Sequence, residues 1–196
     1  EPPRCDARTN VRLRCIERGS GTDAAQRRRV TDPTEVHVRA AVSSDADGIA
    51  RVFVESAMHH ARIDPDRYVV PATASVSARY RTGQQGGEAL SIGNVTLVAE
   101  LSGDIVGFVD ARLDRSPDPM HRNLLYCHIG EIAVSAQYRS RGIGGRLLRA
   151  AEDWGRRNGA EFAYLEYHVD NPRAGVFYQR RMGYRVAGLA AIRRLS

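Results

Sequence analysis

The stretch QYRSRGIGGRLLRA, residues 137–150, governs the interpretation of the whole chain. It holds glycines at 142, 144 and 145, and four arginines lie among and around them. Apolar residues then recur every three or four positions, at Ile143, Leu147, Ala151 and Trp154, which predicts a helix. Glycines at a strand-to-helix turn let backbone N–H groups approach an anion, and the helix start adds about half a positive charge. The stretch therefore predicts a phosphate-binding loop.

Three phosphate-binding designs can be compared with this stretch. A Walker loop needs a lysine after its last glycine, and the chain has no lysine, since all 29 basic residues are arginine. A Rossmann fingerprint needs a glycine at position 147, which is leucine, although Glu161 or Glu166 lies near the expected acidic position. The strands before the loop also form a meander, which disfavours that design. The third design is R-x-x-G-x-G, residues 139–144, directly after a strand. The alternative is a helix cap and a tight turn without a ligand.

Hydrophobic periodicity and turn residues predict the other elements. A helix begins after Ser43 or Ser44 as its cap, and a second helix covers part of 72–81. A short helix has Pro172 at its first turn, and Asn158-Gly159 ends the helix that follows the glycine loop. Strands are predicted at 36–41, on both sides of the turn Ser102-Gly103-Asp104, at 124–134 and 161–169, with one or two closing strands in 184–195.

This order of elements predicts an α+β fold with a mostly antiparallel sheet and helices packed on it. Residues 1–35 are polar, mixed in charge and without periodicity, which predicts a disordered or loosely packed tail. Residues 36–196 would then form a single domain. The run 27–29 is all arginine, and such runs are more often solvated than bound to nucleic acid.

Charge, cysteines and hydropathy limit the function classes. The net charge of +6 favours a phosphate-bearing partner, either a nucleic acid or a phosphorylated cofactor. The three cysteines are too few and too far apart for a disulfide framework or a zinc site, and Cys127 is expected to be a small buried residue. There is no apolar run that spans a bilayer and no secretory signal pattern, so a cytoplasmic protein without a metal is expected.

A second motif follows the glycine loop at a distance of one helix and one strand. It comprises Asn171, Ala174, Tyr178 and the triplet Met182-Gly183-Tyr184. Together the two motifs resemble the GCN5-related N-acetyltransferases, the GNAT superfamily, whose segment N-x-x-A-x-x-x-Y-x-x-x-G-F/Y is one residue shorter before the glycine. Ala136 also departs from the proline that is common in relatives. The resemblance covers residues 36–196 and is strongest between Ile129 and Tyr184.

The resemblance implies a central sheet that is splayed between its fourth and fifth strands, and acetyl-coenzyme A as cosubstrate. The N–H groups of the glycine loop would hold the pyrophosphate, arginine side chains would pair with phosphate oxygens, and the N–H of Val134 would meet the thioester carbonyl. The residues implied for cofactor binding are Ile132, Ala133, Val134, Arg139, Ser140, Arg141, Gly142, Ile143, Gly144, Gly145, Arg146 and Asn171.

Direct acetyl transfer needs a base for the acceptor amine and an acid for the leaving thiolate. The resemblance implies that Tyr178 is the acid. For the base, Glu131 is favoured and Glu166 is the second candidate, while a water relay stays open. His128 lies on the same predicted strand as Glu131, and strand alternation places the two on opposite faces unless a bulge intervenes.

The acceptor is expected to be a primary amine of a small molecule or a peptide, bound near residues 58–68 and 116–123. Asp64, Asp66, Asp114 and Asp118 are candidates to attract a cationic amine, although each is also typical of a cap or turn. The alternative functions are a non-catalytic acyl-coenzyme A sensor and an arginine-rich nucleic-acid binder. No stacking stripe or helix-turn-helix pattern supports the latter, so neither a nucleic acid nor a membrane is expected as partner. Homodimerisation stays open.

Overall fold

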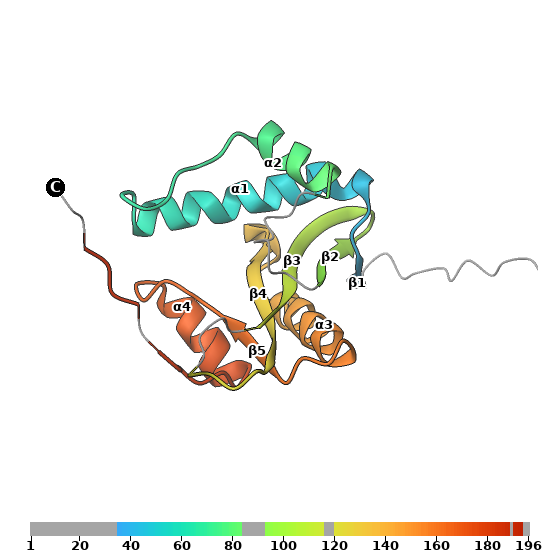
Figure 1. Cartoon of the computed structure of the whole chain (residues 1–196). Coiled ribbons are helices and arrows are strands. Elements are labelled where there is room, and N and C mark those ends of the chain that lie inside the picture. The colour runs from blue at the N-terminus through green and yellow to red at the C-terminus, as the bar shows by residue number, and fades with distance from the viewer. Residues whose placement is uncertain (1–34, 84–92, 116–119, 189, 194–196) are drawn as a thin grey trace, which may run out of the picture. The chain divides into compact units, whose positions relative to one another are not determined.

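The computed structural model describes residues 35–83, 93–115, 120–188 and 190–193. Except for residue 35, the predicted N-terminal tail lies outside the described residues. The described chain forms a sheet with helices on both of its faces (Figure 1). None of the described helices is long and apolar enough to cross a membrane.

The sheet has five strands in the order β1-β2-β3-β4-β5. All neighbours are antiparallel except β4 and β5, which are parallel, so the predicted α+β class with a mostly antiparallel sheet is confirmed. The elements in chain order are β1 (His37–Ala40), α1 (Ala46–Ile63), α2 (Thr73–Arg81), β2 (Gly93–Leu101), β3 (Asp104–Arg115), β4 (Leu125–Val134), α3 (Ile143–Arg157), β5 (Phe162–Leu165) and α4 (Pro172–Gly175).

Short turns join several of these elements as the sequence predicts. Ser102 and Gly103 connect β2 to β3 with positive φ angles of 54° and 87°, the pattern of a type I′ hairpin turn. Gly159, also left-handed, follows the end of α3, where its N–H bonds the carbonyl of Arg156. These local signals depend on few residues, which is why the sequence alone reveals them.

Apolar side chains from alternate strand positions fill two layers, one on each face of the sheet. On one face, Leu147 and Leu148 of α3 pack against strand residues such as Val109. On the other, Ile49 of α1 and Tyr80 of α2 pack against a different set of strand residues. Figure 1 shows α1 and α2 on one side of β3 and β4, and α3 on the other. Helices therefore cover both faces of the central strands.

Cys127 lies at the closest approach of α3 to β4. It is 1% exposed and its Sγ donates to the carbonyl of Ala151, so the expected small buried residue is confirmed. Burial raises the pKa of its thiol to about 11. A Cβ placed on Gly155 would lie 2.5 Å from Cβ of Cys127, so only glycine lets the helix come this near.

The sheet opens between β4 and β5. Their pairing joins Tyr126–Ile129 with Phe162–Leu165, and β5 ends there, whereas β4 continues to Val134. The predicted splay between the fourth and fifth strands is therefore present. Beyond Ile129, the edge of β4 that faces away from β3 has no strand partner among the described residues.

The prediction of one or two closing strands is wrong for the described residues 184–188 and 190–193, which form no regular structure. Alanines and a glycine dominate this segment, and both residue types are depleted in strands. Its β-branched residues Val186 and Ile192 are 52% and 67% exposed, so they bury little surface that would hold a strand in place.

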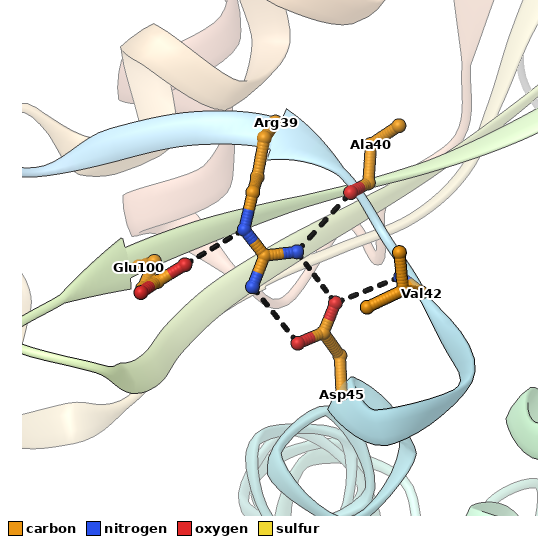
Figure 2. A network of polar contacts seen from close by, with 5 residues as sticks. All are labelled: Arg39, Ala40, Val42, Asp45 and Glu100. Carbon is orange, nitrogen blue, oxygen red and sulfur yellow. Dashed lines mark hydrogen bonds and ion pairs between the residues drawn. The ribbon is translucent and has the colours of Figure 1, made fainter. Parts of the chain in front are cut away.

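The start of α1 is fixed by an arginine rather than by the predicted serine cap. Ser43 and Ser44 form a 3-10 turn with Asp45, and the Asp45 carboxylate accepts the N–H of Val42. Arg39 donates to both oxygens of Asp45, at 2.6 and 2.9 Å, and to Glu100 of β2 at 2.7 Å (Figure 2). This contact lowers the pKa of Asp45 and ties the first turn to the sheet edge.

Asp45→Asn should lower the free energy of unfolding by about 1 kcal/mol at neutral pH, because the pair is partly screened by water at Arg39. Since the folded-state pKa of Asp45 lies below its unfolded value, this contribution is present above the unfolded pKa and is lost as the pH falls through the folded pKa. Urea unfolding of the two proteins should thus differ at neutral pH and converge in strong acid. Asp153→Asn breaks a more exposed pair with Arg156 and is the matched control. An equal loss of unfolding free energy in Asp45→Asn and Asp153→Asn would contradict the role of the Arg39 contact in fixing the start of α1.

Candidate active site

The loop between β4 and α3 presents unpaired backbone N–H groups. Ser140 and Gly142 have positive φ angles of 63° and 79°. From Ser140 to Gly145, no backbone N–H donates a hydrogen bond to any described residue, and the first bond of α3 is that from Arg146 N–H to the Gly142 carbonyl. An ordinary helix start leaves about four such groups free, and here two more precede them. A helix cap and a turn alone do not need these two.

Three arginines of the loop keep their positive charge available. Arg139 Nε donates to the Val134 carbonyl at 2.9 Å, and Arg146 donates to the Val36 carbonyl at 3.1 Å. The Arg141 guanidinium lies over the Tyr138 ring. All three are exposed, and none has an ion pair with a described residue. The three guanidinium groups are therefore available to an anionic ligand, since the nearby Glu55 carboxylate is bonded to Ser135 and Ala136 and forms no ion pair with them.

The last residues of β4 alternate between its two edges. Ser135 N–H bonds the Val106 carbonyl, so antiparallel alternation places Val134, opposite Gly107, in a non-hydrogen-bonded pair. The N–H of Val134 therefore points away from β3, into the opening beside β5, as does that of Ile132. By the same alternation the backbone of Ala133 pairs with β3, and its side chain packs in the core beneath α1 and α2.

A β-bulge at Gly130 reorients the end of β4. Asp110 pairs with Glu131 and Ala111 pairs with Ile129, so Gly130 is an extra residue. Ile129 packs on the α3 side, yet Glu131 accepts a hydrogen bond from Ser56 of α1 at 3.2 Å. The bulge therefore brings Glu131 and His128 to the same face, contrary to simple alternation.

Glu131 has the properties of a base that works near neutral pH. Burial is the main cause that raises the pKa of Glu131 to about 7, and the Asp110 charge adds to it, while the Ser56 hydrogen bond opposes both. His128 instead contacts Asp114 at 3.2 Å and the Tyr164 ring. A carboxyl group that titrates near 7 can accept a proton and release it again at physiological pH.

Tyr178 lies in a π turn, Val176–Arg181, directly after α4. The bond from Met182 N–H to the Phe177 carbonyl spans five residues, so the π turn absorbs the extra residue of the second motif. Burial raises the pKa of Tyr178 to about 12, and the charge of Glu131 adds a smaller effect. Its hydroxyl makes no hydrogen bond to a described residue and is therefore available to a ligand.

The structure does not bring Glu166 and Asn171 into contact with these groups. Glu166 is exposed, just beyond β5, and accepts a hydrogen bond from Tyr164 at 2.7 Å. The Asn171 side chain caps α4 by accepting the N–H of Ala174 at 3.2 Å. Asn171 thus has a structural role that the sequence did not reveal.

Comparison with known proteins agrees with this geometry. The sequence profile described as the acetyltransferase (GNAT) family matches residues 66–184, more than half of the chain. The chain belongs to this family. It is thus an N-acetyltransferase, and its reaction is acetyl transfer.

The acetyltransferase has relatives in sequence and in structure. The uncharacterized N-acetyltransferase YhfO of Bacillus subtilis is 28% identical over 76% of this chain and 89% of its own length. A tetramutant of the BH1408 protein from Bacillus halodurans superimposes with a TM-score of 0.71 at 20% identity, over 81% of this chain and 99% of its own. AAC(6')-Iy, solved with the bisubstrate analog CoA-S-monomethyl-acetylneamine, has a TM-score of 0.60 at 15% identity, over 83% and 99%.

A cleft of about 300 Å³ lies between α1 of the acetyltransferase and the loop after β4. Glu55 closes one side of it by accepting hydrogen bonds from Ser135 Oγ at 3.0 Å and from Ala136 N–H at 2.8 Å. Its lining residues are Glu55, Met58, His59, Arg62, Ser135, Ala136, Gln137 and Arg139. Met58 and His59 belong to the predicted acceptor wall, whereas residues 116–119 of the second predicted wall lie outside the described residues.

Sequence reasoning missed Glu55 and Ser56. Ser56 follows Ile49 and Val52 on the buried stripe of α1, and a hydroxyl on an apolar stripe is a signal that could have revealed it. Glu55 gave no such signal, because its partners Ser135 and Ala136 are 80 residues away along the chain.

Gly142→Ala should weaken coenzyme A binding about tenfold, because alanine disfavours positive φ by about 1–2 kcal/mol and the loop N–H groups would turn away. No atom lies within 4 Å of the added Cβ, so the effect is conformational. Isothermal titration calorimetry measures the affinity.

Gly159→Ala is the matched control, since Gly159 is equally left-handed but lies at the other end of α3. It should lower thermal stability and leave coenzyme A affinity unchanged. Equal affinity losses in the two variants would point to general destabilisation and contradict a binding loop.

Proposed function

We propose that the protein transfers the acetyl group of acetyl-coenzyme A directly to a primary amine of a small molecule or a peptide. The observation that carries this proposal is two sets of unpaired N–H groups, one at the splay of β4, from Ile132 and Val134, and one at the start of α3, from Ser140 to Gly145. AAC(6')-Iy, which has the same fold, was solved with a coenzyme A bisubstrate analog.

The backbone from Ser140 to Gly145 would hold the pyrophosphate. Its six N–H groups lack partners among the described residues, and the helix start adds a favourable field for an anion. Arg141 and Arg146 are exposed beside it and can pair with phosphate oxygens, including the ribose phosphate. These groups would contact phosphate oxygens and not the acyl chain. This part of the site would therefore select coenzyme A irrespective of the acyl group.

The N–H of Val134 would bind the thioester carbonyl oxygen. It points into the opening between β4 and β5, and a fixed donor there stabilises the negative charge that develops on that oxygen. Ile132, which faces the same opening, would lie along the pantetheine arm. Ala133 would support the strand from the core and would not touch the arm with its side chain.

Glu131 and Tyr178 would carry the two proton transfers. The amine nitrogen forms the new C–N bond, and Glu131 accepts the proton that the nitrogen gives up. The C–S bond breaks, and the Tyr178 hydroxyl donates its proton to the leaving sulfur. Glu131 then releases its proton to solvent and Tyr178 regains one, so the products are an amide and coenzyme A.

The acceptor would enter from the α1 side, where Ser56 and the cleft lie. Of the aspartates predicted to attract it, Asp114 is paired with Arg112 and Asp64 contacts Arg67 and His168. These two therefore have structural partners, and Asp118 lies outside the described residues. Glu131 and its strand partner Asp110 are the carboxyl groups that face α1 and α2 on this side of the sheet.

Tyr178→Phe tests the acid. We expect kcat to fall about 100-fold, because the thiolate leaves without a proton, while coenzyme A affinity stays the same. Thiol release from acetyl-coenzyme A is followed with a panel of amino sugars, polyamines, amino acids and peptides.

Tyr184→Phe is the matched control for Tyr178→Phe, since Tyr184 packs on the Tyr178 ring but donates to Glu152. Its kcat should stay within a few-fold of wild type. A Tyr178→Phe protein with full activity on the best amine would exclude the acid role. If no amine in the panel releases thiol while coenzyme A still binds, the transfer to such amines would be refuted.

Glu131→Gln and Glu166→Gln discriminate between the two candidate bases. Because Glu131 is half-buried beside α1 and Glu166 is exposed beyond β5, Glu131→Gln should lower kcat/KM about 100-fold and Glu166→Gln less than a few-fold. With wild type, kcat/KM should rise with pH through about 7, where Glu131 loses its proton. If Glu166→Gln lowered kcat/KM more than Glu131→Gln did, the base would be Glu166.

A further inference from the structure

Asp110 and Glu131 face each other across β3 and β4. They are partners in the antiparallel register, and the bulge at Gly130 turns Glu131 to the face that Asp110 already occupies. Directly opposite residues of neighbouring strands have Cβ atoms about 5 Å apart. Both side chains lie beneath α1 and α2, where Ser56 contacts one and Tyr80 the other.

The two carboxyl groups receive unequal numbers of hydrogen bonds. Asp110 accepts one from Thr96 Oγ1 at 2.5 Å and one from the Tyr80 hydroxyl at 2.6 Å. Glu131 accepts one, from Ser56, at 3.2 Å. Hydrogen bonds to an ionised carboxylate favour that form, so a negative charge is better held on Asp110 than on Glu131.

Few positive charges are near enough to neutralise both carboxyl groups. Neither forms an ion pair with a described residue, and the nearby cation, Arg79, lies over the Tyr80 ring. The other groups that contact the pair are Ser56 of α1, with His60 behind it, Thr96 of β2 and Tyr80 of α2. The charge of Glu131 also raises the pKa of Tyr178. Two like charges at this separation repel strongly when buried.

We propose that Asp110 and Glu131 act as one carboxyl pair that keeps a single proton up to about neutral pH, with the charge on Asp110 and the proton on Glu131. Asp110 is then a positioning residue that sets the pH at which Glu131 becomes able to accept a proton from the acceptor amine. This inference rests on the proposed role of Glu131 as base. Tyr80 and Thr96 take part by stabilising the charge on Asp110.

The directions of the two pKa shifts agree with this division. Burial is the main cause that raises the pKa of each, and the Asp110 charge contributes to the rise at Glu131. The two hydroxyl donors act against burial at Asp110. Interacting groups of this kind release their protons in two separated steps that belong to the pair.

Asp110→Asn tests the inference, because it removes the charge and keeps the side-chain shape. Glu131 should then ionise at lower pH, so the rise of kcat/KM with pH moves down by about one unit or more. The ratio of kcat/KM at pH 6 to that at pH 8 should increase about fivefold relative to wild type for a shift of one unit. The acceptor titrates identically with both enzymes, so comparing their ratios isolates Glu131.

Asp114→Asn is the matched control, since Asp114 is also on β3 but contacts Arg112 and His128. It should leave the pH profile in place. An Asp110→Asn profile that coincides with wild type would overturn the inference, as would an equal shift in Asp114→Asn.

A measurement on wild type without turnover covers the case in which Asp110→Asn does not fold. Carbon-13 NMR of labelled carboxyl groups, with Glu131 assigned by Glu131→Gln, should show Glu131 titrating near neutrality. Titration of Glu131 near the ordinary glutamate value of about 4.3 would refute the pair. If Glu131 titrates near neutrality but Glu131→Gln keeps full activity, the base role fails and the pair stands, so the two failures are distinguishable.

Discussion

The site depends on the point at which β4 loses its second neighbour. A sheet normally satisfies both edges of an inner strand, and β5 does so only as far as Leu165. Beyond that point the outer-edge N–H groups of Ile132 and Val134 are unpaired among the described residues, and a second unpaired set follows from Ser140 to Gly145 at the start of α3. Unpaired backbone donors at a partly buried strand are costly unless a ligand or water satisfies them. A ligand that accepts hydrogen bonds from these groups would remove that cost, so the splay is suited to ligand binding.

Helix α1 connects the two halves of the candidate site through consecutive residues. Glu55 holds Ser135 and Ala136 at the start of the glycine loop, and Ser56 holds Glu131. A movement of α1 would therefore displace the loop and the proposed base together. The contact of Arg39 with Asp45 and Glu100 fixes the first turn of this helix to the sheet edge (Figure 2). A surface ion pair far from the chemistry thus helps to keep the two halves in register.

Which features the sequence could predict depends on how far apart in the chain the interacting residues lie. The glycine loop, the hairpin turn and the helices depend on residues close in sequence, and the order of elements then limits the sheet to a few topologies. The bulge at Gly130 and the π turn at Tyr178 depend on register with distant segments, so they were not predicted in detail. Each nevertheless has a sequence signal. For the bulge it is a glycine inside a strand pattern, and for the π turn it is a motif spacing that is one residue too long. The closing strand failed for the opposite reason, since the local pattern suggested a strand for which the described residues offer no strand partner.

The bulge also determines the surroundings of the proposed base, Glu131, and hence its pKa. If Gly130 were an ordinary paired residue of β4 and not a bulge, alternation would point Glu131 to the face that Ile129 occupies, among apolar side chains packed with α3. With the bulge, the carboxyl group meets Ser56 and lies opposite Asp110, so burial and charge raise its pKa together. The anion-binding loop, by contrast, consists of backbone N–H groups that do not titrate. Coenzyme A binding and proton transfer would therefore respond separately to pH, and the orientation of the proposed base would be set by one bulge in one strand.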